Sequence, residues 1–335
     1  MNLNFLIAPF AWLLKQLYLF TGNYGVAIIL FALLTKIVLL YFSARGKRGM
    51  MQTQRIQPKQ QALAKKYEKD KAKYQQEMQK LYQDEGVSMT GGCLWTLLPF
   101  PLLIALYGIV RQPLTHMLGL AQDKIDELVA FVGKIPGVDL AANQNFYQMT
   151  VADEISKHYD EVSQAFPGIL NINLNFLGLN MAEVPKLGFN WMMIIPILSA
   201  GTACLSMWMN MKFSKQMGAQ QGQNKMMMFL SPLMSLWFAF MLPALMGVYW
   251  IAQNVFGMVQ DYFLSKHYLK VFAEEDALKA EKEARRKAAE EAMKEEQRQR
   301  RAEAIAAKKE KRKPGQTVYT MQKKPKMKDE SSSDS

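Results

Sequence analysis

Residues 25–42, GVAIILFALLTKIVLLYF, form an apolar run of membrane-spanning length that contains one charged residue, Lys36. About 18 mainly apolar residues suffice to cross a bilayer as a helix, since each adds about 1.5 Å. Lys36 would then lie about 9 Å from the end of the run. An ammonium group at the centre of a membrane helix costs roughly 2.5–3.5 kcal/mol, so water, a partner or a function must relieve it. Alternatively, the lysine stem reaches back to the membrane interface.

The composition is that of a polytopic membrane protein. Half of the 335 residues are hydrophobic, yet the mean hydropathy is close to zero, so apolar and charged residues are separated into blocks. The net charge of +12 is concentrated in particular loops and the tail, where it indicates orientation, anionic lipid or an RNA-rich partner. Two cysteines and three scattered histidines predict neither a disulfide framework nor a metal site, and no cofactor is expected.

Residues 1–21 are apolar but contain Pro9 and Lys15, and they lack both a basic start and a small-residue cleavage site. This pattern predicts an interfacial amphipathic helix and not a cleaved signal. An uncleaved first span is the alternative.

Residues 43–90 hold eleven Lys and Arg against five Asp and Glu, which indicates a cytoplasmic loop. Apolar and aromatic residues recur between Leu63 and Leu81 at steps of three, four or seven, as on one face of a helix. Asp84–Gly86 can end this helix, and a shorter helix is expected before Pro58. The loop is therefore predicted to be a two-helix hairpin, and the plainer alternative is a solvated, charged hairpin without a binding role.

The second span is predicted at residues 91–111, where Pro99 and Pro101 predict a kink. The carbonyls that prolines free must find hydroxyls, water or neighbouring helices, and Thr96 lies on the same face as Tyr107. Residues 112–188 reverse the charge balance, with four lysines against nine acids. Short helices joined by loops, outside the membrane, are expected there.

Two later spans carry polar stripes at helical spacing. In the third span, residues 189–209, small hydroxyl residues either join neighbouring helices or line a wet cavity. The fifth span, residues 245–264, forms an antiparallel pair with the fourth, residues 226–242, and has polar residues along one side. The stripes consist of Ser199, Thr202 and Ser206 in the third span and of Trp250, Gln253, Asn254, Gly257 and Asp261 in the fifth.

The positive-inside rule places the basic loops and the tail on the cytoplasmic side and the amino terminus outside. The tail holds twenty Lys and Arg against fourteen Asp and Glu, with opposite charges at i, i+4 that predict a solvated helix. It is either only solvated or an electrostatic handle for ribosomal RNA or anionic headgroups. The predicted fold is all-α, with an interfacial helix (1–21), spans at 22–42, 91–111, 189–209, 226–242 and 245–264, a cytoplasmic hairpin (43–90), an extracellular loop (112–188), a cytoplasmic loop (210–225) and a basic tail (265–335).

The sequence contains no enzyme signature: neither paired intramembrane carboxylates nor a metalloprotease, phosphate-loop or dinucleotide motif occurs. Instead, Lys36 and the two polar stripes could face one another around a wet interior. Such an interior would lower the cost of moving a short hydrophilic segment partway across the membrane, and a buried ammonium would attract the acidic residues of that segment. The small number of spans and the absence of an inverted repeat count against a transporter.

Four motifs resemble the YidC family of membrane protein insertases. They are GNYGVAIILFALLTKIVLL (22–40), QPKQQALAKKY with QQEMQKLYQDEGV (57–67 and 75–87), GGCLWTLLPFPLLIALYGIV (91–110) and LPALMGVYWIAQN (242–254). The resemblance covers roughly residues 22–264 and is to the short, Gram-positive form. It implies a five-helix core with a positively charged groove open to cytoplasm and lipid.

Three positions depart from the family pattern. Lys36 stands where the family usually has arginine, which keeps the charge but loses the fork of five donors. Ala32 replaces a groove threonine, and Pro99 replaces a glutamine of the second span. Tyr249 and Trp250 match the aromatic pair of the family's groove.

The sequence therefore predicts a cell-membrane insertase and chaperone that acts without an energy source and is not an enzyme. Its partners would be nascent membrane proteins, the ribosome through the tail, the general secretion channel and anionic lipids. The alternatives are a small channel or lipid-scrambling protein that uses the same groove, and a purely structural subunit. The expected groove residues are Lys36, Ala32, Thr96, Ser199, Thr202, Ser206, Tyr249, Trp250, Gln253 and Asn254.

Overall fold

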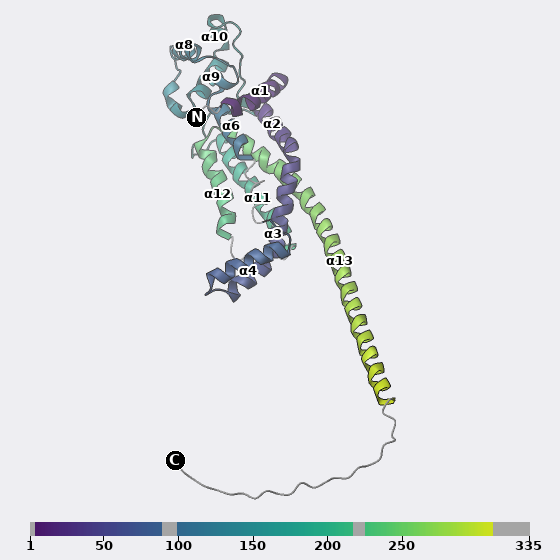
Figure 1. Cartoon of the computed structure of the whole chain (residues 1–335). Helices are drawn as coiled ribbons and strands as arrows, with labels where there is room; N and C mark the ends of the chain where they lie inside the picture. The colour runs from purple at the N-terminus through teal and green to yellow at the C-terminus, as the bar shows by residue number, and fades with distance from the viewer. Residues whose placement is uncertain (1–3, 89–98, 217–224, 311–335) are drawn as a thin grey trace, which may run out of the picture. The chain divides into compact units, whose positions relative to one another are not determined.

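The computed structural model describes residues 4–88, 99–216 and 225–310 (Figure 1). The chain divides into two compact units, Met1–Lys270 and Val271–Ser335. The first unit contains the helical core, and the second contains the end of a long helix.

Helix α1 (Asn4–Thr21) packs on α2 (Tyr24–Val38) and α6 (Pro99–Arg111). Its buried residues recur at i, i+4, i+7 and i+11, from Ile7 to Tyr18, which is one face of a helix. The opposite face is also largely apolar, since Phe5, Trp12 and Phe20 are exposed. An apolar outer face suits contact with lipid, and the interfacial position of this helix stays a prediction.

The first predicted span is not one straight helix. Helix α2 ends at Val38, and α3 (Leu40–Lys66) follows after a bend of 64° at Leu39. Helix α3 thus begins inside the apolar run, and the membrane boundary expected at residues 42 and 43 stays a prediction. The hydroxyl of Thr35 donates to the Ala32 carbonyl at 3.0 Å, and such back-bonding often bends helices.

The hairpin consists of α3 and α4 (Lys71–Asp84), which lie side by side (Figure 1). The expected break before Pro58 is wrong, since α3 continues through Pro58 to Lys66. The turn comes instead at residues 67–70, where the side chain of Asp70 accepts a hydrogen bond from the Lys73 amide at 3.0 Å and caps α4. Helix α4 ends at Asp84, and Gly86 has a positive φ of 63°.

The segment after α6 forms short helices: α7 (Pro113–His116), α8 (Gln122–Val132), the 3₁₀ helix η1 (Leu140–Phe146), α9 (Tyr147–Lys157) and α10 (Tyr159–Ala165). In Figure 1, α8, α9 and α10 lie close together. A small antiparallel hairpin of β1 (Asn175–Phe176) and β2 (Leu179–Asn180) follows. Its two turn residues, Leu177 and Gly178, both have positive φ, as a type I′ turn requires.

Hydrogen bonds fasten this segment to the long helices of the first unit. The Tyr18 hydroxyl of α1 donates to the Asn171 carbonyl at 2.5 Å and accepts from the Asn173 amide at 2.9 Å. The carbonyls of Met181 and Glu183 accept from the Leu245 and Ala244 amides, which are the first N–H groups of α13 (Ala244–Glu310). Donors at a helix start otherwise lack partners, so the segment caps α13.

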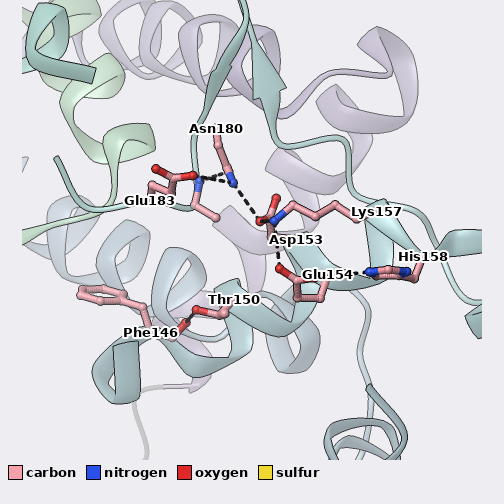
Figure 2. A network of polar contacts seen from close by, with 9 residues as sticks. Phe146, Thr150, Asp153, Glu154, Lys157, His158, Asn180 and Glu183 are labelled. Carbon is pink, nitrogen blue, oxygen red and sulfur yellow. Dashed lines mark hydrogen bonds and ion pairs between the residues drawn. The ribbon is translucent and has the colours of Figure 1, made fainter. Parts of the chain in front are cut away.

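A polar network joins parts of this segment to one another (Figure 2). Lys157 forms ion pairs with Asp153 at 2.7 Å and Glu154 at 2.9 Å. The Asn180 amide donates to Asp153 at 2.8 Å, which joins β2 to α9. Burial lowers the pKa of Lys157, but its hydrogen bonds with the two carboxylates outweigh burial and raise the pKa above its ordinary value.

The remaining helices are α11 (Ile194–Gln216), preceded by the 3₁₀ turn η2 (Trp191–Met193), then α12 (Lys225–Met241) and α13 (Ala244–Glu310). Helix α11 extends seven residues past the expected end of the third span at residue 209, so the loop expected at 210–225 is partly helical. Helix α13 runs without interruption through the expected boundary at residue 264. Helix α11 packs mainly on α12.

In the described part of the chain, one helix, Trp191–Lys215, is long and apolar enough to cross a membrane, and the bent pair α2–α3 is a second if counted as one span. Residues 100–111 and 232–241 form shorter apolar helices. The count of five spans therefore stays a prediction. Helix α6 starts at Pro99, so the expected kink and Thr96 fall at the edge of, or outside, the described residues.

Candidate functional site

One side of α13 brings together polar groups from three other helices. Asn254, Gly257 and Asp261 recur at i, i+3 and i+7 and therefore share one face. This face meets α11, α2 and α3. We use the name polar seam for Lys36, Lys47, Thr202, Asn210, Asn254 and Asp261, whose contacts are described next.

Side-chain hydrogen bonds join α13, α11 and α12 at one end of the seam. The Asn254 amide donates to the Thr202 hydroxyl at 3.1 Å and to the Ser199 carbonyl at 3.5 Å. The fully buried Ser199 hydroxyl lies 2.8 Å from that of Ser235 on α12. Ser206 is half-buried further along α11. The hydroxyls of Ser199 and Thr202 thus join helices, which was one of the two interpretations of their stripe.

Lys36 is half-buried, and its ammonium faces α13. A Cβ atom placed on Gly257 would lie 3.3 Å from Lys36 Nζ, so the glycine leaves room for the ammonium. The carboxylate of Asp261 attracts Lys36 electrostatically. Among the described residues, no hydrogen-bond acceptor or carboxylate lies within contact distance of Nζ. The ammonium therefore lies against α13 without a direct ion pair among the described residues. Snorkelling to the membrane interface stays the alternative prediction.

Lys47 is a second lysine of the seam, and sequence reasoning missed it. Only 7% of this residue is exposed. Its ammonium donates to the Asn210 side-chain oxygen at 3.0 Å and lies 3.4 Å from Asp261 Oδ1. The sequence contains a signal for this pairing, because Asp261 is the single acid in the five predicted spans and an acid in a membrane helix needs a partner.

The other expected groove residues have different surroundings. Ala32 and Tyr249 are buried in the apolar core, and Tyr249 is hydrogen-bonded to Gln253 one turn later. Trp250 is half-buried and packs against Phe238, with 5.5 Å between ring centroids. Thr96 lies outside the described residues. The structure therefore brings Lys36, Thr202 and Asn254 to the seam, whereas Ala32 and Tyr249 lie in the apolar core.

An apolar cavity of about 730 Å³ lies beside the seam, between α2, the β-hairpin, α11 and α13. Its lining includes Ile29, Ile195 and Val255 and consists of apolar residues and glycine. None of the expected groove residues lines it. This cavity and the polar seam thus occupy different positions around α13. In the described ranges, no three potential metal ligands gather in one place.

Comparison with known proteins gives one consistent match. The family model described as "60Kd inner membrane protein" matches residues 16–271. A "Membrane protein insertase YidC" from Caldanaerobacter subterraneus is 28% identical over 254 residues, which is 76% of this chain and 91% of the relative. A protein of the same name from Fusobacterium nucleatum is 23% identical over 264 residues, 78% of this chain and 96% of the relative. A third, from Chlorobium phaeovibrioides, is 27% identical over 266 residues but only 36% of its length is covered.

Proposed function

The chain belongs to the 60Kd inner membrane protein family, and from this membership and the polar seam we propose that it inserts nascent membrane proteins into the cell membrane. The named relatives are insertases and not enzymes, so no catalysed reaction is assigned to the chain. The proposed orientation is amino terminus outside and carboxyl terminus in the cytoplasm, from the distribution of basic loops.

The observation that carries the proposal is the position of Lys36. Its ammonium lies within the helix bundle against Gly257 and is only partly compensated by Asp261. The seam holds two ammonium groups, Lys36 and Lys47, and one carboxylate, so it has an excess of one positive charge. In surroundings of low polarity this excess attracts the acidic residues of a client's outer segment more strongly than it would in water.

The apolar helix of the client would leave along an exposed apolar face. On α12, Leu233, Met234, Trp237 and Met241 are exposed. Methionine and aromatic side chains adapt to many different partners, which suits contact with clients of varied sequence. Partition of the client helix into lipid supplies the driving force, because apolar segments are stable in the hydrocarbon core.

The hairpin and the tail are proposed as contacts for the partners that deliver clients. The hairpin α3–α4 would receive the nascent chain, and the basic tail would bind ribosomal RNA or anionic lipid, beside the general secretion channel where that takes part. In the second unit, four i, i+4 pairs occupy Arg285, Lys287, Lys294 and Arg300 on an exposed helix. We therefore assign binding of ribosomal RNA or anionic lipid mainly to the basic end of the tail, after residue 310.

The test is insertion of a single-spanning client with a short acidic outer tail into proteoliposomes. We compare the wild type with Lys36→Arg, Lys36→Gln and Lys36→Leu, and use Lys15→Gln on α1 as the matched control. Arginine should retain insertion, whereas glutamine and leucine should reduce it about tenfold, which corresponds to about 1.4 kcal/mol. Equal insertion by all four forms would show that the charge has no role. Ion flux or lipid scrambling without a client would instead support a channel or scramblase.

A further inference from the structure

The carboxylate of Asp261 lies between two lysines that belong to opposite sides of the α2–α3 bend. Lys36 precedes the bend at Leu39 by three residues, and Lys47 follows it by eight. Lys47 Nζ is 3.4 Å from Asp261 Oδ1, whereas Lys36 interacts with Asp261 only electrostatically. Asp261 therefore forms its direct ion pair with Lys47, and the Lys36 ammonium remains available to another carboxylate.

From this arrangement we propose that Asp261 is a positioning residue that sets how strongly the seam attracts an acidic client segment. The inference rests on the proposed insertase function and deepens it. A client carboxylate that approaches Lys36 meets the attraction of both lysines and the repulsion of Asp261. The internal carboxylate thus competes with the client, so an acidic segment binds the seam without being held so strongly that it cannot leave.

The contacts of Lys47 explain how Asp261 can do this without blocking the seam. Lys47 has a second partner, the Asn210 side-chain oxygen at 3.0 Å, and is almost fully buried. Both partners hold Lys47 in place, and Lys47 in turn holds Asp261 at a fixed distance from Lys36. Asp261 itself is one-third exposed, with 33% of its side chain accessible, so a client segment can sense its charge.

The same contacts make Asp261→Asn an informative variant. Asparagine has nearly the same shape and keeps an oxygen that can accept from Lys47, while Asn210 still pairs with Lys47. The substitution removes one negative charge and raises the excess in the seam from one positive charge to two. The effect on a client should therefore depend on the client's charge, whereas a structural defect would affect all clients alike.

The experiment uses the full chain in proteoliposomes and two versions of one single-spanning client. One version has two aspartates in its outer tail, and the other has asparagines at the same positions. The quantity measured is the ratio of acidic to neutral client inserted. Asp261→Asn should raise this ratio about three- to tenfold, and Asp261→Glu should leave it near the wild-type value. Glu85→Gln changes a partly exposed acid of the hairpin that pairs with Lys59 outside the seam; it is the matched control and should not change the ratio.

Lys47→Gln provides a test in the opposite direction and does not depend on the folding of Asp261→Asn. Without Lys47, the Asp261 carboxylate is available to Lys36, so the ratio should fall toward one. The inference is overturned if the wild type inserts clients but Asp261→Asn leaves the ratio unchanged or lowers it. It is also overturned if Lys47→Gln leaves the ratio unchanged. If the wild type itself inserts neither client, the proposed insertase function fails, and this inference fails with it.

Discussion

Replacing Gly247 by alanine tests the close approach of α13 to α11. A Cβ atom on Gly247 would lie 2.3 Å from Ile195 Cγ2 and 3.8 Å from Ile195 Cβ. Ile195 is 5% exposed, and a β-branched side chain in a helix has one strongly preferred χ1 rotamer. Ile195 lines the apolar cavity beside α13, so its side chain can yield only by leaving this rotamer towards that space. The alanine methyl group must therefore push the two helices apart or force Ile195 out of its rotamer.

The expected cost follows from two opposing effects. Overpacking of a buried contact costs about 1–3 kcal/mol, and a distance of 2.3 Å favours the upper part of this range. Alanine recovers up to about 1 kcal/mol, because it favours the helix more than glycine does. The net loss of unfolding free energy should be about 1–2 kcal/mol. Asn254 lies two turns later on α13, so its hydrogen bond with Thr202 should weaken too.

The assay is reversible denaturant unfolding in detergent micelles, with Gly201→Ala as the matched control. Gly201 lies on α11 and a Cβ atom there would meet nothing within 4 Å, so the control should be neutral or slightly stabilising. In a double-mutant cycle, Ile195→Ala should cost less in the Gly247→Ala background than alone, because it removes the clashing methyl group. If Gly247→Ala were as stable as Gly201→Ala, the two helices would not approach as described.

Two further predictions concern parts of the chain outside the seam. Burial lowers the pKa of His116 below its ordinary value of 6.5, so the unfolded chain takes up a proton first as the pH falls. The contribution of His116 to stability should therefore be fully present above pH 6.5 and decrease below it. In thermal unfolding between pH 7.5 and 5, His116→Gln should flatten this decrease. An unchanged pH profile of the variant would contradict the assignment. Asp70→Ala removes the α4 cap and should cost about 1 kcal/mol, measured as faster hydrogen exchange in α4 relative to a Glu68→Ala control. Equal exchange in both variants would count against the cap.

Helical periodicity predicted much of what surrounds the seam. The stripe on residues 250–261 correctly indicated that Asn254, Gly257 and Asp261 share a face of one helix, because a period of 3.6 residues persists whatever the helix packs against. The bend at Leu39 could not be predicted in the same way. Neither proline nor glycine occurs near it, and the back-bonding of Thr35 to Ala32 is visible only in the folded chain.

The pairing of Lys47 with Asp261 illustrates a second limit. Sequence spacing relates residues on one helix, but these two come from helices more than 200 residues apart along the chain. The charge pattern assigns Lys47 to a cytoplasmic loop that begins at residue 43. Once α3 begins at Leu40, inside the apolar run, the same lysine lies in the bundle at 7% exposure.

The β-hairpin shows a third limit, which concerns local signals. A type I′ turn is normally recognised by Asn-Gly or Asp-Gly, and here it is Leu177-Gly178. Leucine in a left-handed conformation is unfavourable by itself, so other contacts must select it. Phe176 packs directly over Gly25 of α2, where an added Cβ would lie 2.4 Å from the ring. This contact and the hydrogen bond from the Asn23 side-chain amide to the Asn175 carbonyl hold the hairpin against α2.

The charge arrangement of the seam follows from a balance between two costs. An ammonium with no nearby acid would be expensive inside the bundle, whereas an ammonium in a direct ion pair would offer little to a client. Two lysines and one carboxylate satisfy both requirements, because the direct pair with Lys47 fixes Asp261 while Lys36 receives only its longer-range field. A single lysine with the same aspartate would lose the available charge. The second lysine thus pairs directly with Asp261, which leaves the half-buried Lys36 ammonium without a direct ion pair among the described residues.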